Sequence, residues 1–223
     1  MPDDQRPVAW DLYWTTVEGH LGAGPSGFIR WALPFLASAP GADVIELGSG
    51  AGRDLRFLLE NGFRVRGIDF SAEAVRIARQ LLTALPEEVS ARGSVDRGEA
   101  EQFLARQSPD TTAAIVGLVL YQTLSEEELP RLFAAVHRAL RPGGFHLWCV
   151  RDDGHPLRER GAMVPPNQGG PSESRVAHRF FSEARCDALS AGGFERVQLE
   201  RRPETHYLFI ADRKPTGGPV APQ

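Results

Sequence analysis

The strongest chemical signal in the sequence is a glycine-rich turn that follows a short apolar run. Residues 44–52 read Val-Ile-Glu-Leu-Gly-Ser-Gly-Ala-Gly, and a helical pattern of leucines begins directly afterwards. This order predicts a buried strand, a tight turn and a helix start. Glycines let the backbone approach a ligand closely, and the free N–H groups at the helix start face the same ligand. The stretch therefore predicts a binding site for a nucleotide-like molecule.

The spacing of Gly48, Gly50 and Gly52 limits which ligand fits. A dinucleotide fingerprint, G-x-G-x-x-G, would need a glycine at position 53, where the chain has Arg53. The phosphate-loop pattern that ends in Gly-Lys-Ser/Thr is also absent. What is present is an acid, Glu46, followed by x-G-x-G-x-G.

An aspartate follows the turn at a distance typical of ribose recognition. Asp69 ends the strand predicted over 63–69, and its carboxylate can accept two hydrogen bonds from a diol. The alternative is that Asp69 caps a helix, but Ser71 is better placed as the N-cap of the helix predicted over 72–84. We therefore expect Asp69 to bind a ribose.

These signals together resemble the class I S-adenosylmethionine (SAM) dependent methyltransferases, with Glu-Leu-Gly-Ser-Gly-Ala-Gly as their motif I. The resemblance covers residues 43–150 by motifs and reaches 212 by element order. It implies that Asp69 is the ribose-binding acid and that Phe70 lies against the adenine. It also implies that Glu46 and the three glycines belong to the cofactor site.

Two further segments carry the resemblance. Gly-Glu-Ala-Glu at 98–101 resembles the family's Gly-Asp-Ala-Glu signature, which implies that Glu99 binds the adenine amino group and that the N–H of Ala100 meets a ring nitrogen. Asp96 is the alternative to Glu99. After the fourth strand, predicted over 113–118, the resemblance implies that Leu118 lines the cofactor through its backbone.

The family fold implied is a Rossmann-like α/β fold, with helices on both faces of a seven-stranded, mostly parallel sheet. Only the last strand, inserted between two others, is expected to be antiparallel. Leu-Arg-Pro-Gly-Gly at 140–144 resembles the turn before the family's fifth strand. Strands are predicted over 43–47, 63–69, 94–97, 113–118, 145–150, 194–200 and 205–211, and helices over 28–38, 52–61, 72–84, 125–140 and 182–191.

The chain divides into a domain over 41–212 and two flanking segments. Residues 1–40 are predicted to form an N-terminal lid or helical segment, with Pro34 as a kink or break. Residues 151–179 show no clean periodicity and are predicted to form a long loop on the substrate side. Residues 213–223 are predicted to be a flexible tail.

Three large aromatic residues lie close together in the N-terminal segment, as Trp10-Asp11-Leu12-Tyr13-Trp14. One interpretation is a helix that packs its aromatic rings on the core. The other is a lid helix whose rings line the site, because aromatic faces attract a cationic sulfonium. In that interpretation Trp14 contacts the cofactor, and Trp10 and Tyr13 contact the substrate.

Two residues are candidates for acid–base work. Tyr121 follows the fourth strand, at the carboxyl end where open α/β sheets bind ligands, and is expected to contact the substrate. His155 lies in the 151–179 loop and is the residue type that titrates near neutrality; the alternative is a solvent-exposed loop histidine. The acid that many family members carry at the start of the fourth strand is replaced by Ala113, so we expect methyl transfer to depend mainly on alignment.

Composition excludes several classes. A net charge of −4 argues against non-specific nucleic-acid binding. No apolar run approaches the length of a membrane span and no signal-peptide core is present, so we expect a cytoplasmic protein. Cys149 and Cys186 lie far apart and outside any CxxC pair, which predicts neither a disulfide framework nor a metal site. Cys149 is expected in the core.

The function predicted is SAM-dependent methyl transfer to a small-molecule N, O or S acceptor, with S-adenosyl-L-homocysteine as the product. The aromatic start and the Gly-Arg-Asp continuation of motif I are similar to thiopurine-type and tellurite-resistance-type enzymes. One alternative is a SAM-binding regulatory protein without transfer activity. Another is a NAD-dependent oxidoreductase, against which Arg53 stands. The acceptor and the oligomeric state are left open.

Overall fold

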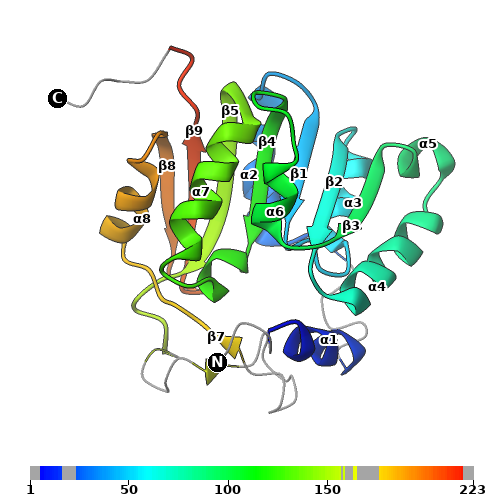
Figure 1. The fold of residues 1–223 in the computed structure, drawn as a ribbon, viewed down its shortest axis with the longest axis horizontal. Helices are drawn as coiled ribbons and strands as arrows, with labels where there is room; N and C mark the ends of the chain where they lie inside the picture. The colour runs from blue at the N-terminus through cyan, green and yellow to red at the C-terminus, as the bar shows by residue number, and fades with distance from the viewer. Residues whose placement is uncertain (1–5, 17–23, 157, 159–162, 165–175, 218–223) are drawn as a thin grey trace.

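The computed structural model describes residues 6–16, 24–156, 158, 163–164 and 176–217. Helices and strands alternate through most of this part of the chain (Figure 1). The helices are α1 (Arg6–Thr16), α2 (Gly27–Ser38), α3 (Arg53–Glu60), α4 (Ala72–Thr83), α5 (Glu87–Ser90), α6 (Ala100–Ala105), α7 (Glu128–Ala139), α8 (Glu183–Ser190) and the short 3₁₀ turn η2 (Leu120–Thr123). The strands are β1 (Asp43–Leu47), β2 (Arg64–Asp69), β3 (Gly93–Arg97), β4 (Thr112–Leu118), β5 (Leu140–Arg151), β6 (Met163–Val164), β7 (Val176–Ala177), β8 (Glu195–Arg202) and β9 (Tyr207–Arg213).

Seven strands form the main sheet, in the order β3-β2-β1-β4-β5-β9-β8. The strands from β1 to β5 pair in parallel, whereas β9 runs antiparallel to both β5 and β8. The predicted topology is therefore confirmed, including the single antiparallel strand inserted between two others. The strand order changes direction between β1 and β4, because β2 and β3 extend the sheet on one side and β5 extends it on the other. Open α/β sheets bind ligands at such a switch point.

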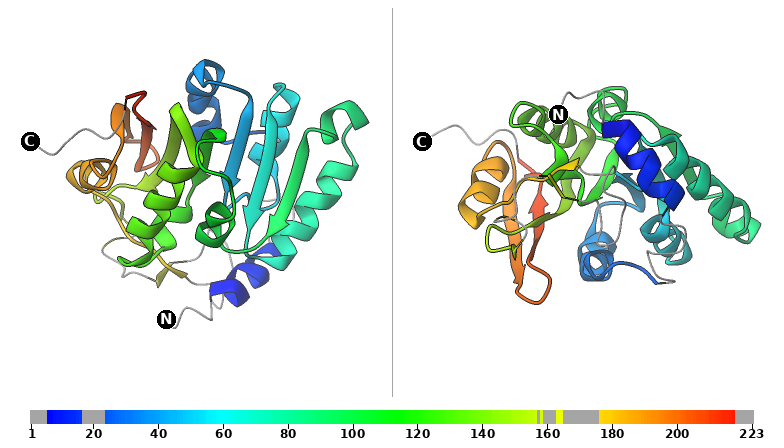
Figure 2. Two further views of the ribbon diagram at one scale, coloured as in Figure 1. Left: turned by 45° about the horizontal axis from the view of Figure 1, so that its top comes forward. Right: turned by 90° about the horizontal axis from the view of Figure 1, so that it is seen from below.

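The register brings the ends of the central strands to one edge. Leu47 of β1 pairs with Ile68 of β2 and with Gly117 of β4. Leu118 pairs in turn with Cys149 of β5. The glycine turn, Asp69 and the end of β4 therefore meet at the carboxyl edge of the sheet, and α1 lies below that edge (Figures 1 and 2).

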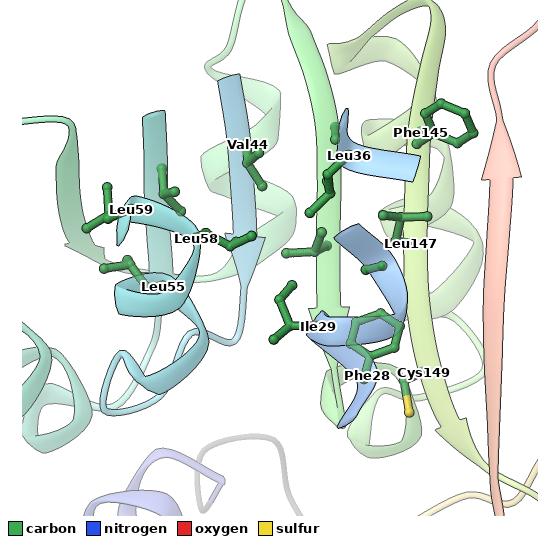
Figure 3. Packing of buried hydrophobic residues seen from close by; sticks show 14 of the residues in the cluster. Phe28, Ile29, Leu36, Val44, Leu55, Leu58, Leu59, Phe145, Leu147 and Cys149 are labelled. Atoms are coloured by element: carbon green, nitrogen blue, oxygen red, sulfur yellow. The ribbon is translucent and has the colours of Figure 1, made fainter. Parts of the chain in front are cut away.

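Alternating side chains of the central strands supply two separate cores. Val44, Ala114 and Leu147 face α2, α3 and α4, as the close view of this layer shows for part of the cluster (Figure 3). Ile45 and Ile115 face the opposite way, toward α6, α7 and α8. Burial on both faces is the reason these strands read as continuous apolar runs. Cys149 lies in the first of these cores, as expected.

Three local predictions differ from the structure. Pro34 lies inside α2 without ending it: Pro34 is exposed, while Ala32 and Leu36 on the other face are held in the core. The 151–179 stretch is not all loop, since Arg151 belongs to β5 and two short strands, β6 and β7, pair within it.

The predicted tail at 213–223 is wrong at its beginning. Arg213 is the last residue of β9. The ammonium of Lys214 donates to Asp110 and to the carbonyl oxygens of His137 and Leu140, at 2.6–2.8 Å. These bonds extend the ordered chain past the last strand. No helix in the described ranges is long and apolar enough to cross a membrane.

Candidate functional site

A cavity of about 230 Å³ opens at the carboxyl edge of the sheet. A smaller hollow of about 40 Å³ adjoins it and shares Gly48, Asp69, Phe70 and Leu120 with it. The cavity is lined by Arg6, Gly48, Ile68, Asp69, Phe70, Gly98, Glu99, Ala100, Glu101, Gln102, Leu120, Leu124, Glu128, Arg131 and Leu132. The hollow adds Trp10, Leu118, Val119 and Thr123. Seven of the predicted site residues are thus brought together: Trp10, Gly48, Asp69, Phe70, Glu99, Ala100 and Leu118.

The three glycines of the turn have three different surroundings. All three have positive φ, at 68°, 54° and 84° for Gly48, Gly50 and Gly52. Only Gly48 lines the cavity. A Cβ at Gly50 would lie 2.7 Å from the Trp14 ring, and a Cβ at Gly52 would lie 3.2 Å from Ala78 of α4. The second and third glycines therefore give room to the protein's own side chains.

Asp69 is held in place by two backbone donors. Its Oδ2 accepts from the N–H of Gly50 and its Oδ1 accepts from the N–H of Ser71, both at 2.9 Å. Burial raises the pKa of this carboxyl to about 6, against the lowering effect of these two hydrogen bonds. Each carboxylate oxygen can accept a second bond, so the group is oriented and still able to accept from a diol.

Glu99, and not Asp96, is the acid at the cavity. Glu99 lines it and precedes α6, whose residue Phe103 donates its N–H to the Glu99 carbonyl oxygen at 2.9 Å. Asp96 points to solvent and pairs with Arg66 at 3.3 Å. Their positions explain the difference, because Asp96 lies within β3 whereas Glu99 lies beyond the carboxyl end of that strand, directly before α6.

Behind the turn lie two buried polar atoms that lack a partner. Glu46 Oε2 and Ser49 Oγ make no hydrogen bond to any other described residue, although both are buried. Burial, followed by the nearby Asp54 charge, raises the pKa of Glu46 well above its usual value. Because buried polar atoms nearly always have a partner, these two indicate room for a polar partner that the described residues do not supply.

Helix α1 is tied to the rest of the protein at its first residue and near its middle. Asp11 Oδ1 accepts from Ser71 Oγ at 2.5 Å and from the N–H of Glu73 at 3.1 Å, which ties α1 to the start of α4. Arg6 binds Glu128 of α7 with two hydrogen bonds, at 2.6 and 3.3 Å. Sequence patterns predicted neither tie. Glu128 also forms a capping box with Ser125 at the start of α7. No local signal predicts the Arg6 contact, because its partner is 122 residues away.

Both interpretations of the aromatic segment apply, each to different rings. Trp10 lines the smaller hollow. Tyr13 and Trp14 are buried and pack edge-on, with ring centres 4.9 Å apart. Trp14 rests on Gly50, so this helix packs directly on the glycine turn.

The prediction that Tyr121 contacts substrate is wrong in this structure. The turn η2 directs Leu120 and Thr123 to the hollow and Tyr121 into the core, where it is fully buried. Its hydroxyl lies 2.6 Å from His146 Nε2, and burial raises its pKa far above the usual value. Gly117 makes this position possible, since a Cβ there would lie 2.7 Å from the tyrosine ring.

Val119 was not among the predicted site residues, and the predicted acid–base candidate His155 does not line the site. Val119 has φ +69°, a conformation that costs a β-branched residue about 1–3 kcal/mol, and it lines the hollow. His155 is half-buried and is absent from the lining of both the cavity and the hollow. Its ring packs against Phe180 and His206, and burial followed by the Arg151 charge lowers its pKa.

Comparisons with known proteins agree with this geometry. Residues 44–144 match a family described as a methyltransferase domain. Thiopurine S-methyltransferase of Xanthobacter autotrophicus is 34% identical over 97 residues, which cover 43% of this chain and 45% of the relative. Tuberculostearic acid methyltransferase UfaA1 of Mycobacterium tuberculosis is 29% identical over 104 residues, which cover 47% of this chain and 23% of the relative. The matches thus span about half the length of the curated relatives or less.

Solved structures extend the likeness to nearly the whole chain. The 1,6-didemethyltoxoflavin-N1-methyltransferase of Burkholderia thailandensis, with 1,6-didemethyltoxoflavin and S-adenosylhomocysteine bound, superposes with a TM-score of 0.67. It is 21% identical, and the match covers 94% of this chain and 88% of that one. At this identity the likeness establishes a shared Rossmann-like fold. The segment that matches the methyltransferase-domain family, residues 44–144, holds the glycine turn, Asp69, Glu99 and the end of β4.

Proposed function

We propose that this protein binds SAM at the carboxyl edge of its sheet and transfers the methyl group to a small molecule. The observation that carries the proposal is the carboxylate of Asp69, which two backbone N–H groups orient at the wall of the 230 Å³ cavity. A nucleoside is the ligand that suits a fixed carboxylate beside an aromatic ring, here Phe70, and a second acid, here Glu99.

The residues present fit such a cofactor. Asp69 would accept from the ribose hydroxyls, and Phe70 would lie against the base. Glu99 and the N–H of Ala100 would meet the edge of the base. The partnerless Glu46 Oε2 and Ser49 Oγ, behind the glycine turn, would serve the polar amino-acid end or a water bound to it. When bound, SAM supplies an activated methyl group on a good leaving group.

The chain's own contribution is to hold the two reactants and to exclude water. Helix α1, tied to α4 by Asp11 and to α7 by Arg6, lies below the edge where the cavity opens. Trp10 at the hollow adds an aromatic face near the end of β4. In this arrangement proximity and alignment do most of the work, and a base is needed only for an acceptor that is protonated at the working pH.

The acceptor class follows from the shape of the site and from the relatives. The hollow beside Leu118 and Val119 is small, and the net charge of −4 gives no support to a nucleic-acid partner. Among the relatives, the thiopurine S-methyltransferase and the 1,6-didemethyltoxoflavin-N1-methyltransferase are named for small heterocyclic compounds. We propose a small-molecule N, O or S acceptor.

Calorimetric titration with S-adenosylhomocysteine, with NAD as a parallel ligand, tests the cofactor. We expect micromolar binding of S-adenosylhomocysteine that is lost in Asp69→Ala. Binding of NAD alone would overturn the proposal.

A screen of thiol, amine and phenol acceptors with methyl-labelled SAM then tests transfer. Binding without transfer to any of them would favour the alternative, a SAM-binding regulatory protein.

A further inference from the structure

A second polar cluster lies at the end of β5, and the proposed cofactor site does not use it. It consists of Gln122 in η2, Arg151 at the end of β5 and His178 just after β7. Arg151 Nη1 lies 2.7 Å from His178 Nδ1, and Gln122 Nε2 lies 3.3 Å from the same nitrogen. The N–H of Arg151 donates to Gln122 Oε1 at 3.0 Å.

These contacts determine where the proton of His178 is. A guanidinium can only donate, so His178 Nδ1 must accept from Arg151. The amide oxygen of Gln122 is already used by the Arg151 N–H, so its NH₂ group also faces Nδ1. The neutral ring therefore carries its proton on Nε2. Burial, followed by the Arg151 charge, lowers the pKa of His178 to about 3, so the ring stays neutral near pH 7. His178 is thus a fixed donor and not a base.

This donor has no acceptor in the described part of the chain. His178 is 2% exposed, and its Nε2 makes no hydrogen bond. A buried N–H without a partner is destabilising, and such groups in native proteins usually meet a ligand or a water.

The guanidinium of Arg151 also lacks a counter-charge. Arg151 is 5% exposed, and its side-chain partners are neutral: His178 Nδ1 and the Tyr207 hydroxyl at 3.3 Å. Its neighbour Asp152 is already engaged by Arg201 at 2.9 Å and by the N–H of Gly154 at 3.0 Å. No carboxylate within the described ranges pairs with Arg151. Buried charges are normally paired, so this cation is an unfilled half of an ion pair.

The segments that carry the cluster adjoin residues that line the hollow or pair with them. Arg151 lies two residues beyond Cys149, which pairs with Leu118 of the hollow. Gln122 precedes Thr123, which also lines the hollow, and its carbonyl oxygen accepts from the N–H of Arg179 at 2.7 Å. The residues proposed to hold the nucleoside follow β1, β2 and β3, so the β5 side is the one left for the acceptor.

We propose that Arg151 and His178 form an anion subsite that binds a carboxylate, or a comparable oxyanion, of the methyl acceptor. One oxygen of the anion accepts from His178 Nε2–H, and the charge is compensated by the guanidinium. Charge-assisted bonds of this kind are strongest where water is excluded, as it is around both residues. The role in acceptor recognition rests on the proposed function, whereas anion binding itself does not.

The test uses acetate, the simplest carboxylate, and acetamide, its neutral counterpart. Protein with ¹⁵N-labelled histidine is titrated with each at constant ionic strength, with chloride as the balancing anion, and with and without S-adenosylhomocysteine. We expect the His178 imidazole to show the Nε2–H tautomer and a saturable shift with acetate, at least about tenfold tighter than any response to acetamide. The Nδ1–H tautomer, no shift, or equal shifts with both compounds would each overturn the proposal.

Variants of Arg151 test whether the anion binds beside this residue. Arg151→Met should abolish the response, and Arg151→Lys, which keeps the charge and packs more conservatively, should weaken it about tenfold. The matched control is Arg179→Met, in the adjacent residue, because Arg179 already pairs with Glu126 at 3.3 Å. An equal loss in Arg179→Met would contradict the assignment. Binding of S-adenosylhomocysteine is measured on the same samples: its absence, with the acetate response intact, counts against the proposed function and not against the subsite.

Discussion

On the β2 side of the carboxyl edge, the residues that line the cavity are close neighbours in sequence. Asp69 and Phe70 are adjacent, Gly98 to Ala100 are consecutive, and the glycine turn spans five residues. On the β5 side, Gln122, Arg151 and His178 are 27 to 56 residues apart and come from three different segments. A nucleoside pocket built from strand-end turns leaves a pattern in the sequence, whereas a polar cluster built by side-chain packing leaves none.

The largest expected difference in ligand affinity is between variants of two acids near the ends of β2 and β3. Asp69→Ala should weaken S-adenosylhomocysteine binding about 100-fold or more, because two hydrogen bonds to an ionised group are lost. Asp96→Ala is the matched control, since Asp96 faces solvent beside Arg66, and it should leave affinity unchanged. Calorimetry measures both. Equal losses would mean that Asp69 acts only through general stability.

The pH dependence of binding should follow Asp69 as well. Its ionised form accepts from a diol, and its pKa is raised to about 6 by burial. Affinity for S-adenosylhomocysteine should therefore be constant above about pH 7 and fall toward tenfold per unit below pH 6. Because burial raises the pKa of Asp69 above that of an unfolded aspartate, the folded state binds the Asp69 proton more tightly than the unfolded state does. The contribution of this protonation to the free energy of unfolding is therefore lost as pH rises through 6. Asp69→Asn should remove its part of the pH dependence; a profile that keeps its midpoint in this variant would assign it to another group.

A smaller effect is expected from a variant in helix α1, on the rate at which the ligand dissociates. Asp11→Ala removes the ties to Ser71 Oγ and to the Glu73 N–H, and should speed the dissociation of S-adenosylhomocysteine about tenfold as α1 opens more often. Stopped-flow displacement measures the rate. Thr15→Ala, which removes only a bond within the helix to the Leu12 carbonyl, should have no such effect. Unchanged dissociation in Asp11→Ala would show that α1 does not limit release.

The smallest effect on binding is expected at Tyr121. Tyr121→Phe removes a buried partner of His146 and should lower the free energy of unfolding by about 1–2 kcal/mol, as measured by denaturant titration. Affinity for S-adenosylhomocysteine and turnover should not change, because the hydroxyl does not reach the cavity. A large loss of turnover at unchanged stability would show instead that Tyr121 acts on the substrate, as its place after the fourth strand predicts.

Sequence patterns predicted the fold almost completely. The apolar runs, the glycine turn and the caps are local signals, and Ser71 indeed caps α4 by accepting from the N–H of Ala74. Sequence patterns did not predict contacts between side chains that are distant in the sequence. Asp54 lies in the first turn of α3, where an acid suits the helix dipole. It also accepts from the N–H and hydroxyl of Ser26, at 2.7 and 2.5 Å, and so joins α3 to α2.

The sequence by itself predicted the order of the strands along the chain, the glycine turn and the acid Asp69 at the end of the second strand of the sheet, since each depends on residues a few positions apart and on the periodicity of strands and helices. Only the tertiary structure decided which side chains are accessible. A single 3₁₀ turn directs Tyr121 into the core and Thr123 toward the hollow, and packing between β5 and the segment after β7 leaves a cation without a counter-charge and an imidazole N–H without a partner among the described residues. Those outcomes depend on burial and on distances between remote segments, which are set when the sheet and its helices pack together.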